Sequence, residues 1–272
     1  MLESKRIGFI GGGAMGEALI RGMLKAGMVT AAQITISDVV PERLDYLAGA
    51  LGVATTLDSA EVAGNSDVLF LTVKPQTIDD VLDTIAPVVA KNTTVISIAA
   101  GITITTLQGK LPGVPIVRVM PNTAVAVGAG MSAIALGRYA SVKAGELASA
   151  VFASVGRVVT VNEEAMDAVT GLSGSGPAFA YVLIDALADA GVRVGFSRSM
   201  ATVLAAQTLF GAAKMVLETG EHPAKLRDMV TSPGGTSIAG IHVMEQKGVR
   251  AALIDAVVAA TNRSREMGQK IK

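Results

Sequence analysis

The chain has 272 residues, half of them hydrophobic, and its 23 basic and 23 acidic side chains leave no net charge. With no charge imbalance and no basic run, the sequence does not support a nucleic-acid partner or binding to an anionic membrane. There is no cysteine and there are two histidines, so disulfides and thiol chemistry are excluded, no metal site is expected, and a cytoplasmic location is favoured.

The mean hydropathy of +0.52 is high, yet no apolar run reaches the length of a membrane span. We therefore expect no membrane partner, and we interpret the apolar composition as a large subunit interface.

Short β-rich runs alternate with helical segments up to residue 161, which is typical of a parallel α/β sheet. The expected strands are 6–10, 33–37, 68–73, 94–98, 116–120, 131–135 and 158–161. Proline suits the first turn of a helix and serine suits an N-cap. On these signals the expected helices are 15–26, 41–50 and 141–154.

Beyond residue 162 the sequence shows helical periodicity and no convincing strand. The expected helices there are 177–190, 199–217, 223–230, 238–246 and 249–267. The predicted fold is an α/β Rossmann-like dinucleotide-binding domain, residues 1–162, followed by an all-α helical domain for substrate binding and dimerisation, residues 163–272.

The first strand runs into a G-x-G-x-x-G motif made by Gly11, Gly13 and Gly16, and a helix follows. In that context the glycines allow a tight turn, the approach of a pyrophosphate and close helix–strand packing. The motif predicts dinucleotide binding, with Ala14 and Met15 at the start of the helix. The alternative is a purely structural glycine turn.

The second strand ends at Ser37 and Asp38. An acidic residue there usually binds the adenosine ribose and favours NADH, whereas a nearby arginine favours the 2′-phosphate of NADPH. Asp38 therefore argues for NADH, while Ser37 and Arg43 leave NADPH open. Asp38 could also be an ordinary turn residue.

Two further strand ends contribute to the same expected site. Ligands gather at the carboxyl ends of the strands in a doubly wound sheet, so Lys74 is placed to meet the nicotinamide ribose. A solvated loop lysine is the alternative. Residues 97–101 offer small side chains and free backbone at the same edge.

The segment 231–237 is rich in hydroxyls, carries Gly234 and Gly235, and precedes an apolar helical stretch. A helix N-terminus has unpaired N–H groups and the positive end of the helix dipole, so it attracts anions. Glycines let a ligand approach those groups. The segment could bind a small carboxylate, or it could be only a turn with Thr236 or Ser237 as the N-cap.

The segment 171–177 breaks one helix and starts another, and it resembles the G-x-x-G-x-G-x-x-x-K pattern of the β-hydroxyacid dehydrogenases. In that pattern the lysine transfers a proton, but here its position is Ala180 and the following polar position is Ile184. An alcohol dehydrogenase would need an acid/base group. An iminium substrate, already positive at the hydride-accepting carbon, would not.

The segments 171–177, 191–195 and 231–237, together with the N-terminal glycine motif, resemble the Δ1-pyrroline-5-carboxylate reductase family over essentially the whole chain. The resemblance implies reduction of the cyclic imine to L-proline with NADPH or NADH. Ser237 stands where threonine is common in the family, and Ser59 where an asparagine that contacts the cofactor is frequent.

The resemblance also implies residue roles. Ser237 would be catalytic, its hydroxyl reaching the ring nitrogen. The implied substrate-binding residues are Glu163, Ser232, Gly234, Gly235, Thr236 and Ser237. The implied and predicted cofactor-binding residues together are Gly11, Gly13, Ala14, Met15, Gly16, Ser37, Asp38, Thr72, Val73, Lys74, Pro75, Ala99, Ala100 and Gly101. Glu163 could instead be a helix-start charge.

Members of this family form intertwined dimers through the helical domain, often in rings of dimers, so a homodimer or a decamer is implied. Two other functions stay open. One is reduction of a related imine such as the six-membered piperideine carboxylate, and the other is a non-catalytic, nucleotide-binding regulatory role.

Overall fold

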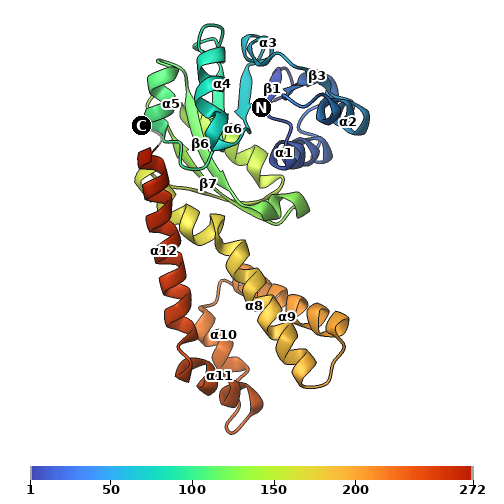
Figure 1. Ribbon diagram of the computed structural model, residues 1–272, viewed down its shortest axis with the longest axis vertical. Coiled ribbons are helices and arrows are strands. Elements are labelled where there is room, and N and C mark those ends of the chain that lie inside the picture. The colour runs from blue at the N-terminus through green and yellow to red at the C-terminus, as the bar shows by residue number, and fades with distance from the viewer. Residues whose placement is uncertain (1, 271–272) are drawn as a thin grey trace. The chain divides into compact units, whose positions relative to one another are not determined.

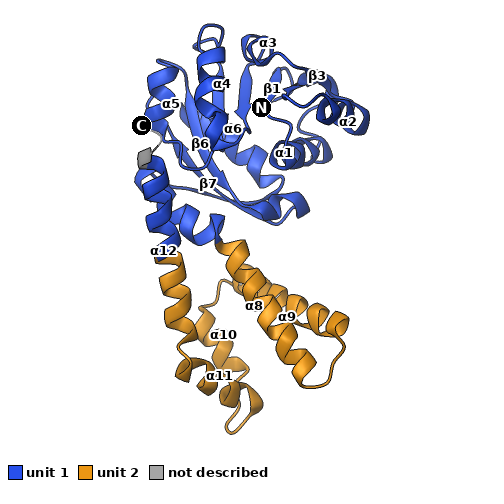
Figure 2. Cartoon of the chain, viewed as in Figure 1, with its two compact units in different colours: residues 1–175, 259–272 blue, residues 176–258 orange. Residues whose placement is uncertain are grey.

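The computed structural model describes residues 2–270, without the side chains of residues 269 and 270. The chain forms two compact units, residues 1–175 together with 259–272, and residues 176–258 (Figure 2). The ends of the predicted domains, Met1 and Lys272, lie outside the described residues.

Unit 1 is built on one eight-stranded sheet whose order is β3-β2-β1-β4-β5-β6-β7-β8 (Figure 1). The strands are β1 (Ile7–Ile10), β2 (Ile34–Ser37), β3 (Ala54–Thr56), β4 (Val68–Leu71), β5 (Thr94–Ser97), β6 (Ile116–Pro121), β7 (Gly130–Leu136) and β8 (Gly156–Thr160).

All neighbouring strands are parallel except β6 and β7. The chain crosses from one half of the sheet to the other between β1 and β4, which is the switch point where nucleotides bind in Rossmann folds. The Rossmann-like prediction is confirmed. The expectation of a parallel sheet fails at the β6–β7 pair, so that β7 and β8 both run opposite to the other strands. The sequence prediction also missed the three-residue edge strand β3.

Side chains that alternate along the central strands pack into two hydrophobic cores, one on each face of the sheet. Phe9 and Phe70 belong to one core and stack with ring centroids 4.5 Å apart. Their neighbours Ile10 and Leu71 belong to the other. Because both faces are covered, these strands are apolar throughout, as buried parallel strands require.

Helices cover both faces. Three of them pack on the Phe9 core: α1 (Ala14–Lys25), α2 (Pro41–Leu51) and α6 (Val142–Ala153). Three others pack on the opposite core: α3 (Ser59–Gly64), α4 (Ile78–Ile85) and α5 (Ile104–Lys110). Pro41 is the first residue of α2, and the Ser141 hydroxyl caps α6, as predicted.

The second half of the described chain is helical, as predicted. The long helices are α8 (Gly176–Arg193), α9 (Arg198–Thr219), α11 (Thr236–Gln246) and α12 (Val249–Lys270), with the shorter α7 (Met166–Val169) and α10 (Pro223–Met229). Within unit 2 only a few residues are buried, among them Ala188, Ala201 and Ala205, and many large apolar side chains are exposed. By length and composition alone, α9 is apolar enough to cross a membrane, and one such helix is weak evidence for a membrane span.

The compact units divide the chain later than the predicted boundary at residue 162. After β8, residues 163–175 stay with the sheet because Met166 is fully buried in the core beneath α4 and α5. The C-terminal part of α12 also belongs to unit 1, where the Ser264 hydroxyl donates to Asp167 Oδ1 at 2.6 Å.

Candidate functional site

The first βα turn has space for a pyrophosphate. Gly11 has φ +99°, and a Cβ there would lie 2.8 Å from the Thr72 backbone. A Cβ on Gly16 would lie 2.7 Å from the Gly11 carbonyl oxygen, so both positions require glycine for packing. A Cβ on Gly13 would meet nothing within 4 Å. Gly13 therefore leaves open space in front of the first amides of α1, which begins at Ala14 and Met15. This cradle fits a dinucleotide phosphate.

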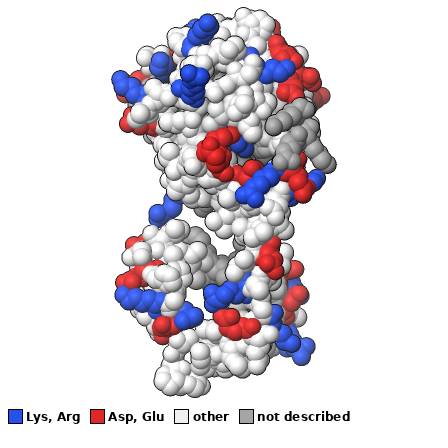
Figure 3. All heavy atoms as spheres, turned by 90° about the vertical axis from the view of Figure 1, so that its left-hand side faces the viewer, with Lys and Arg blue, Asp and Glu red and all other residues white. Residues whose placement is uncertain are grey.

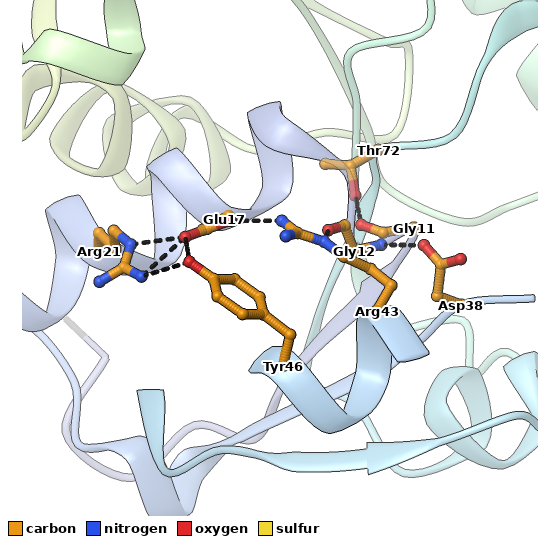
Figure 4. A network of polar contacts seen from close by, with 8 residues as sticks. All are labelled: Gly11, Gly12, Glu17, Arg21, Asp38, Arg43, Tyr46 and Thr72. Atoms are coloured by element: carbon orange, nitrogen blue, oxygen red, sulfur yellow. Dashed lines mark hydrogen bonds and ion pairs between the residues drawn. The ribbon is translucent and has the colours of Figure 1, made fainter. Parts of the chain in front are cut away.

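Asp38 lies at the same turn (Figure 4). Its Oδ2 accepts the Gly12 N–H at 2.7 Å, and its Oδ1 accepts the Val40 N–H at 3.1 Å. A carboxylate has more lone pairs than these two bonds use, so Asp38 retains acceptor capacity for hydroxyl groups. Ser37 is fully buried, and its hydroxyl pairs with that of Ser59 at 3.1 Å.

Arg43 contacts the carbonyl oxygen of Gly12, whereas Asp38 contacts its N–H group. Its Nε donates to the Gly12 carbonyl at 2.6 Å, and its guanidinium pairs with Glu17 on α1. Glu17 also accepts from Arg21 Nε at 2.8 Å and from the Tyr46 hydroxyl at 3.2 Å (Figure 4). Burial raises the pKa of Glu17, but the hydrogen bonds from Arg43 and Arg21 outweigh it and hold that pKa below its ordinary value. Glu17 is therefore charged at neutral pH.

The other predicted cofactor residues lie at the ends of β4 and β5, beside the switch point. The Thr72 hydroxyl donates to the carbonyls of Ile10 and Gly11, at 3.0 and 2.6 Å, and so joins β4 to the glycine turn. Val73 and Pro75 are half-buried, whereas Lys74 is exposed. The segment Ala99, Ala100 and Gly101 follows β5, with Gly101 at φ +77°.

A cavity of about 180 Å³ opens beside Gly101 within unit 1. Its other walls come from the residues just before α8 and from the end of α12. The lining residues include Ala100, Gly101, Thr170, Ser175, Arg263 and Ser264. The cofactor segment after β5 therefore borders a half-open cavity that carries a guanidinium and hydroxyl groups.

Glu163 lies within unit 1 and is held by protein groups. Its Oε1 accepts from Arg118 at 2.6 Å and from the Ile104 N–H at 3.0 Å, and its Oε2 is buried without a hydrogen-bond partner. Arg118 itself is 4% exposed. Glu163 thus neutralises a buried arginine of β6 and binds the first amide of α5. These contacts are those of a structural ion pair. Glu163 is also the first residue of a short 3-10 helix, Glu163–Ala165, which agrees with the alternative of a helix-start charge.

Glu163→Ala is expected to lower the free energy of unfolding by about 3–5 kcal/mol, because it leaves the buried Arg118 guanidinium unpaired. Glu163→Gln keeps an acceptor for Arg118 and Ile104 and should lower it less. Urea unfolding followed by circular dichroism measures both values. Equal stability of all three proteins would show that the ion pair contributes nothing.

In unit 2, the turn before α11 leaves the start of the helix without a side-chain cap. Gly234 has φ +68°, Gly235 is the N-cap with no side-chain cap, and the Gly235 N–H donates to the Ser232 carbonyl at 3.0 Å. Thr236 and Ser237 are the first two helical residues. The alternative that one of them caps α11 is therefore wrong. The turn is mostly exposed. An open hollow of about 530 Å³ runs from Gly234 and Gly235 along the side of α11 to His242 and Glu245.

The segment 171–177 remains helical, contrary to the predicted break. Thr170–Gly174 form a turn of π-helix between α7 and α8, with Val169, Thr170 and Ser175 in the right-handed helical region. The Asn122 amide donates to the Ser173 carbonyl at 3.1 Å and so fixes this turn to β6. Ala180 and Ile184 lie on α8.

Sequence reasoning did not find the roles of Gly12, Glu17 and Arg118. Glu17 and Arg21 are spaced as an i,i+4 pair on a helix, which was a usable signal. The pairing of Glu17 with Arg43, 26 residues away, requires the fold, as does the pairing of Arg118 with Glu163.

Comparisons with known proteins agree with this arrangement. The family described as pyrroline-5-carboxylate reductase dimerisation matches residues 163–267, and the family described as NADP oxidoreductase, coenzyme F420-dependent, matches residues 6–101. A pyrroline-5-carboxylate reductase of Methanosarcina acetivorans is 49% identical over 99% of this chain and 100% of that protein. Human pyrroline-5-carboxylate reductase 2 is 44% identical over 96% of this chain and 83% of that protein.

Solved structures give the same result. The chain is similar to a pyrroline-5-carboxylate reductase from Coxiella burnetii, with a TM-score of 0.92, 35% identity, and 97% of this chain and 98% of that one covered. It is also similar to a pyrroline carboxylate reductase from Plasmodium falciparum with NADP bound. The TM-score is 0.88 and the identity 30%, with 98% of this chain and 100% of that one covered. The chain belongs to the pyrroline-5-carboxylate reductase family.

Proposed function

We propose that this chain reduces Δ1-pyrroline-5-carboxylate to L-proline with NADPH or NADH, and that it holds the substrate carboxylate on the turn Ser232–Ser237. One observation carries the site assignment: α11 begins without a side-chain cap, behind two glycines. Gly234, Thr236 and Ser237 are exposed, so a carboxylate can approach the first amides of α11 and the positive end of its dipole.

The positions of Ala180 and Ile184 support an imine over a ketone. A carbonyl needs a proton donor as it becomes an alcohol, and these apolar side chains supply none. A protonated imine accepts hydride at carbon and becomes the amine with the proton already on nitrogen. Ser237, the second residue of α11, carries the hydroxyl that orients the ring nitrogen. Glu163 is assigned a positioning role: it binds Arg118 and the first amide of α5 and does not itself contact the substrate.

The nucleotide is assigned to the glycine turn and to the ends of β2, β4 and β5. Gly13 leaves room for the pyrophosphate, Asp38 faces the adenosine ribose, and Lys74 is an exposed cation for the second ribose. When bound, the reduced nicotinamide supplies the hydride. The residues from Ala99 to Gly101 have small side chains, which would leave room for the nicotinamide beside this backbone.

The direct test is nucleotide oxidation in the presence of pyrroline-5-carboxylate, run beside the six-membered piperideine carboxylate. We expect turnover with the five-membered ring and competitive inhibition by L-proline, which carries the same carboxylate. Faster turnover of the six-membered ring would assign the chain to the alternative substrate. Nucleotide binding without turnover of either imine would support a regulatory role.

The dimerisation family matched by the helical half implies a homo-oligomer. Exposed apolar residues on α8 and α9, such as Val182, Val203 and Phe210, give the dimer a surface to bury. We extend this proposal to a ring of five dimers, whose molar mass light scattering would measure. We also propose a cytoplasmic location. Basic and acidic side chains are interspersed on the face drawn in Figure 3, which offers no basic surface for nucleic acid.

A further inference from the structure

Arg43 is the cation nearest to the predicted ribose ligand Asp38 in the network of Figure 4, and it is already bound twice. Its Nε donates to the Gly12 carbonyl and its guanidinium pairs with Glu17. It also lies 5.0 Å from the centre of the Tyr46 ring. An arginine that accepts the 2′-phosphate of NADPH needs free N–H groups directed at the phosphate oxygens. Here two of the five N–H groups, on Nε and Nη2, are directed at protein acceptors, and these two bonds fix the position of the guanidinium.

Glu17 is the residue that holds Arg43 in this arrangement. Glu17 lies in the first turn of α1, its side chain is 16% exposed, and it is charged at neutral pH. To reach a phosphate, the guanidinium of Arg43 would have to leave a mostly buried carboxylate. The move would break a mostly buried ion pair and leave Glu17 with only Arg21 and Tyr46 as partners, which is unfavourable. The pair therefore opposes binding of the 2′-phosphate.

The surface next to Asp38, which begins at Val39, also disfavours a 2′-phosphate. An open cavity of about 590 Å³ lies between the ends of β2 and β3 and helix α4. Its walls include the exposed apolar side chains Val39 and Leu57, which suit an adenine ring, and two carboxylates, Asp58 and Asp80. No lysine or arginine is among the described residues that line it. Acidic side chains repel a phosphate and tolerate ribose hydroxyls.

From these contacts we infer that the chain selects NADH over NADPH, and that Glu17 is a specificity-determining residue because it keeps Arg43 away from the adenosine ribose. The inference rests on the proposed nucleotide site. Asp38 would accept hydrogen bonds from the ribose hydroxyls, while Glu17, which touches no part of the nucleotide, acts through Arg43. Glu17 is therefore a positioning residue.

The test is equilibrium binding of NADH and NADPH, followed by nucleotide fluorescence, to the full-length protein. We expect wild-type protein to bind NADH about 10-fold or more tightly than NADPH. Glu17→Gln keeps an acceptor oxygen but removes the negative charge that holds Arg43. It should therefore release Arg43 toward the ribose and tighten NADPH binding about 10-fold, the value of one hydrogen bond to a charged group, with little change for NADH. Arg43→Ala added to Glu17→Gln should remove that gain, and Arg43→Ala alone should leave NADPH binding unchanged.

Arg21→Ala is the matched control, because Arg21 is the second arginine on Glu17 and contacts neither Gly12 nor Asp38 among the bonds of this network. It should leave the ratio of the two dissociation constants as in wild type. Tighter binding of NADPH by wild-type protein overturns the inference even if Glu17→Gln fails to fold. An unchanged ratio in folded Glu17→Gln overturns the role of Glu17. Binding of neither nucleotide would reject the proposed function itself, together with the inference.

Discussion

Gly13→Val is expected to weaken nucleotide binding about 100-fold while leaving the fold intact. A Cβ on Gly13 meets no protein atom within 4 Å, so the added side chain has nothing to displace in the free protein. It would instead fill the space through which the pyrophosphate approaches α1. Overpacking a tight contact costs about 1–3 kcal/mol, and the upper end of that range is about 100-fold in the dissociation constant.

The matched control for this prediction is Gly49→Val. Gly49 is an exposed glycine of α2, and a Cβ there also meets nothing within 4 Å, but it lies outside the glycine motif. Fluorescence titration should show wild-type affinity for Gly49→Val, and circular dichroism should show folded protein for both variants. Tight nucleotide binding by folded Gly13→Val would remove the pyrophosphate from this turn.

The helical half and the central strands could be predicted because their signals are local. Hydrophobic periodicity, a proline in the first turn and a capping serine each depend only on residues that are close in the sequence. The direction of β7 was also open to prediction. β6 ends at Pro121 and β7 begins at Gly130, and a parallel crossover needs a dozen residues or more. A connection this short permits only an antiparallel pair.

Other features depend on contacts between distant segments. β3 has three residues at the edge of the sheet, too few for a pattern to emerge. The charge of Glu163 was visible, but its partner Arg118 lies on a strand 45 residues earlier. The Glu17–Arg43 pair likewise forms only when α1 and α2 pack side by side. A sequence pattern locates the glycine turn, whereas the packing of its neighbours decides which groups surround it.

In the proposed function, the turn before α11 binds the substrate carboxylate through its amides and orients the ring nitrogen through the Ser237 hydroxyl. Thr236 is the first helical residue, a position at which proline is well tolerated, and the extended backbone of Gly235 suits a following proline. Thr236→Pro therefore removes one N–H of the anion site and keeps the helix. We expect KM for pyrroline-5-carboxylate to rise about 10- to 100-fold, the value of a hydrogen bond to a charged group. Thr236→Ala, which retains the N–H, should keep a KM near wild type.

Ser237→Ala keeps every amide of the turn and removes only the hydroxyl. It should therefore leave KM close to wild type and lower kcat about 10- to 1,000-fold, because in the proposed function the hydroxyl orients the ring nitrogen during reduction. Steady-state kinetics at saturating nucleotide measures both constants for each variant. If folded Thr236→Pro keeps its KM and Ser237→Ala keeps its kcat, the turn only starts a helix, and the substrate carboxylate binds elsewhere in the enzyme. A split in the predicted direction, with KM changed by one variant and kcat by the other, cannot arise from a general loss of α11, because unfolding the helix would change both constants together.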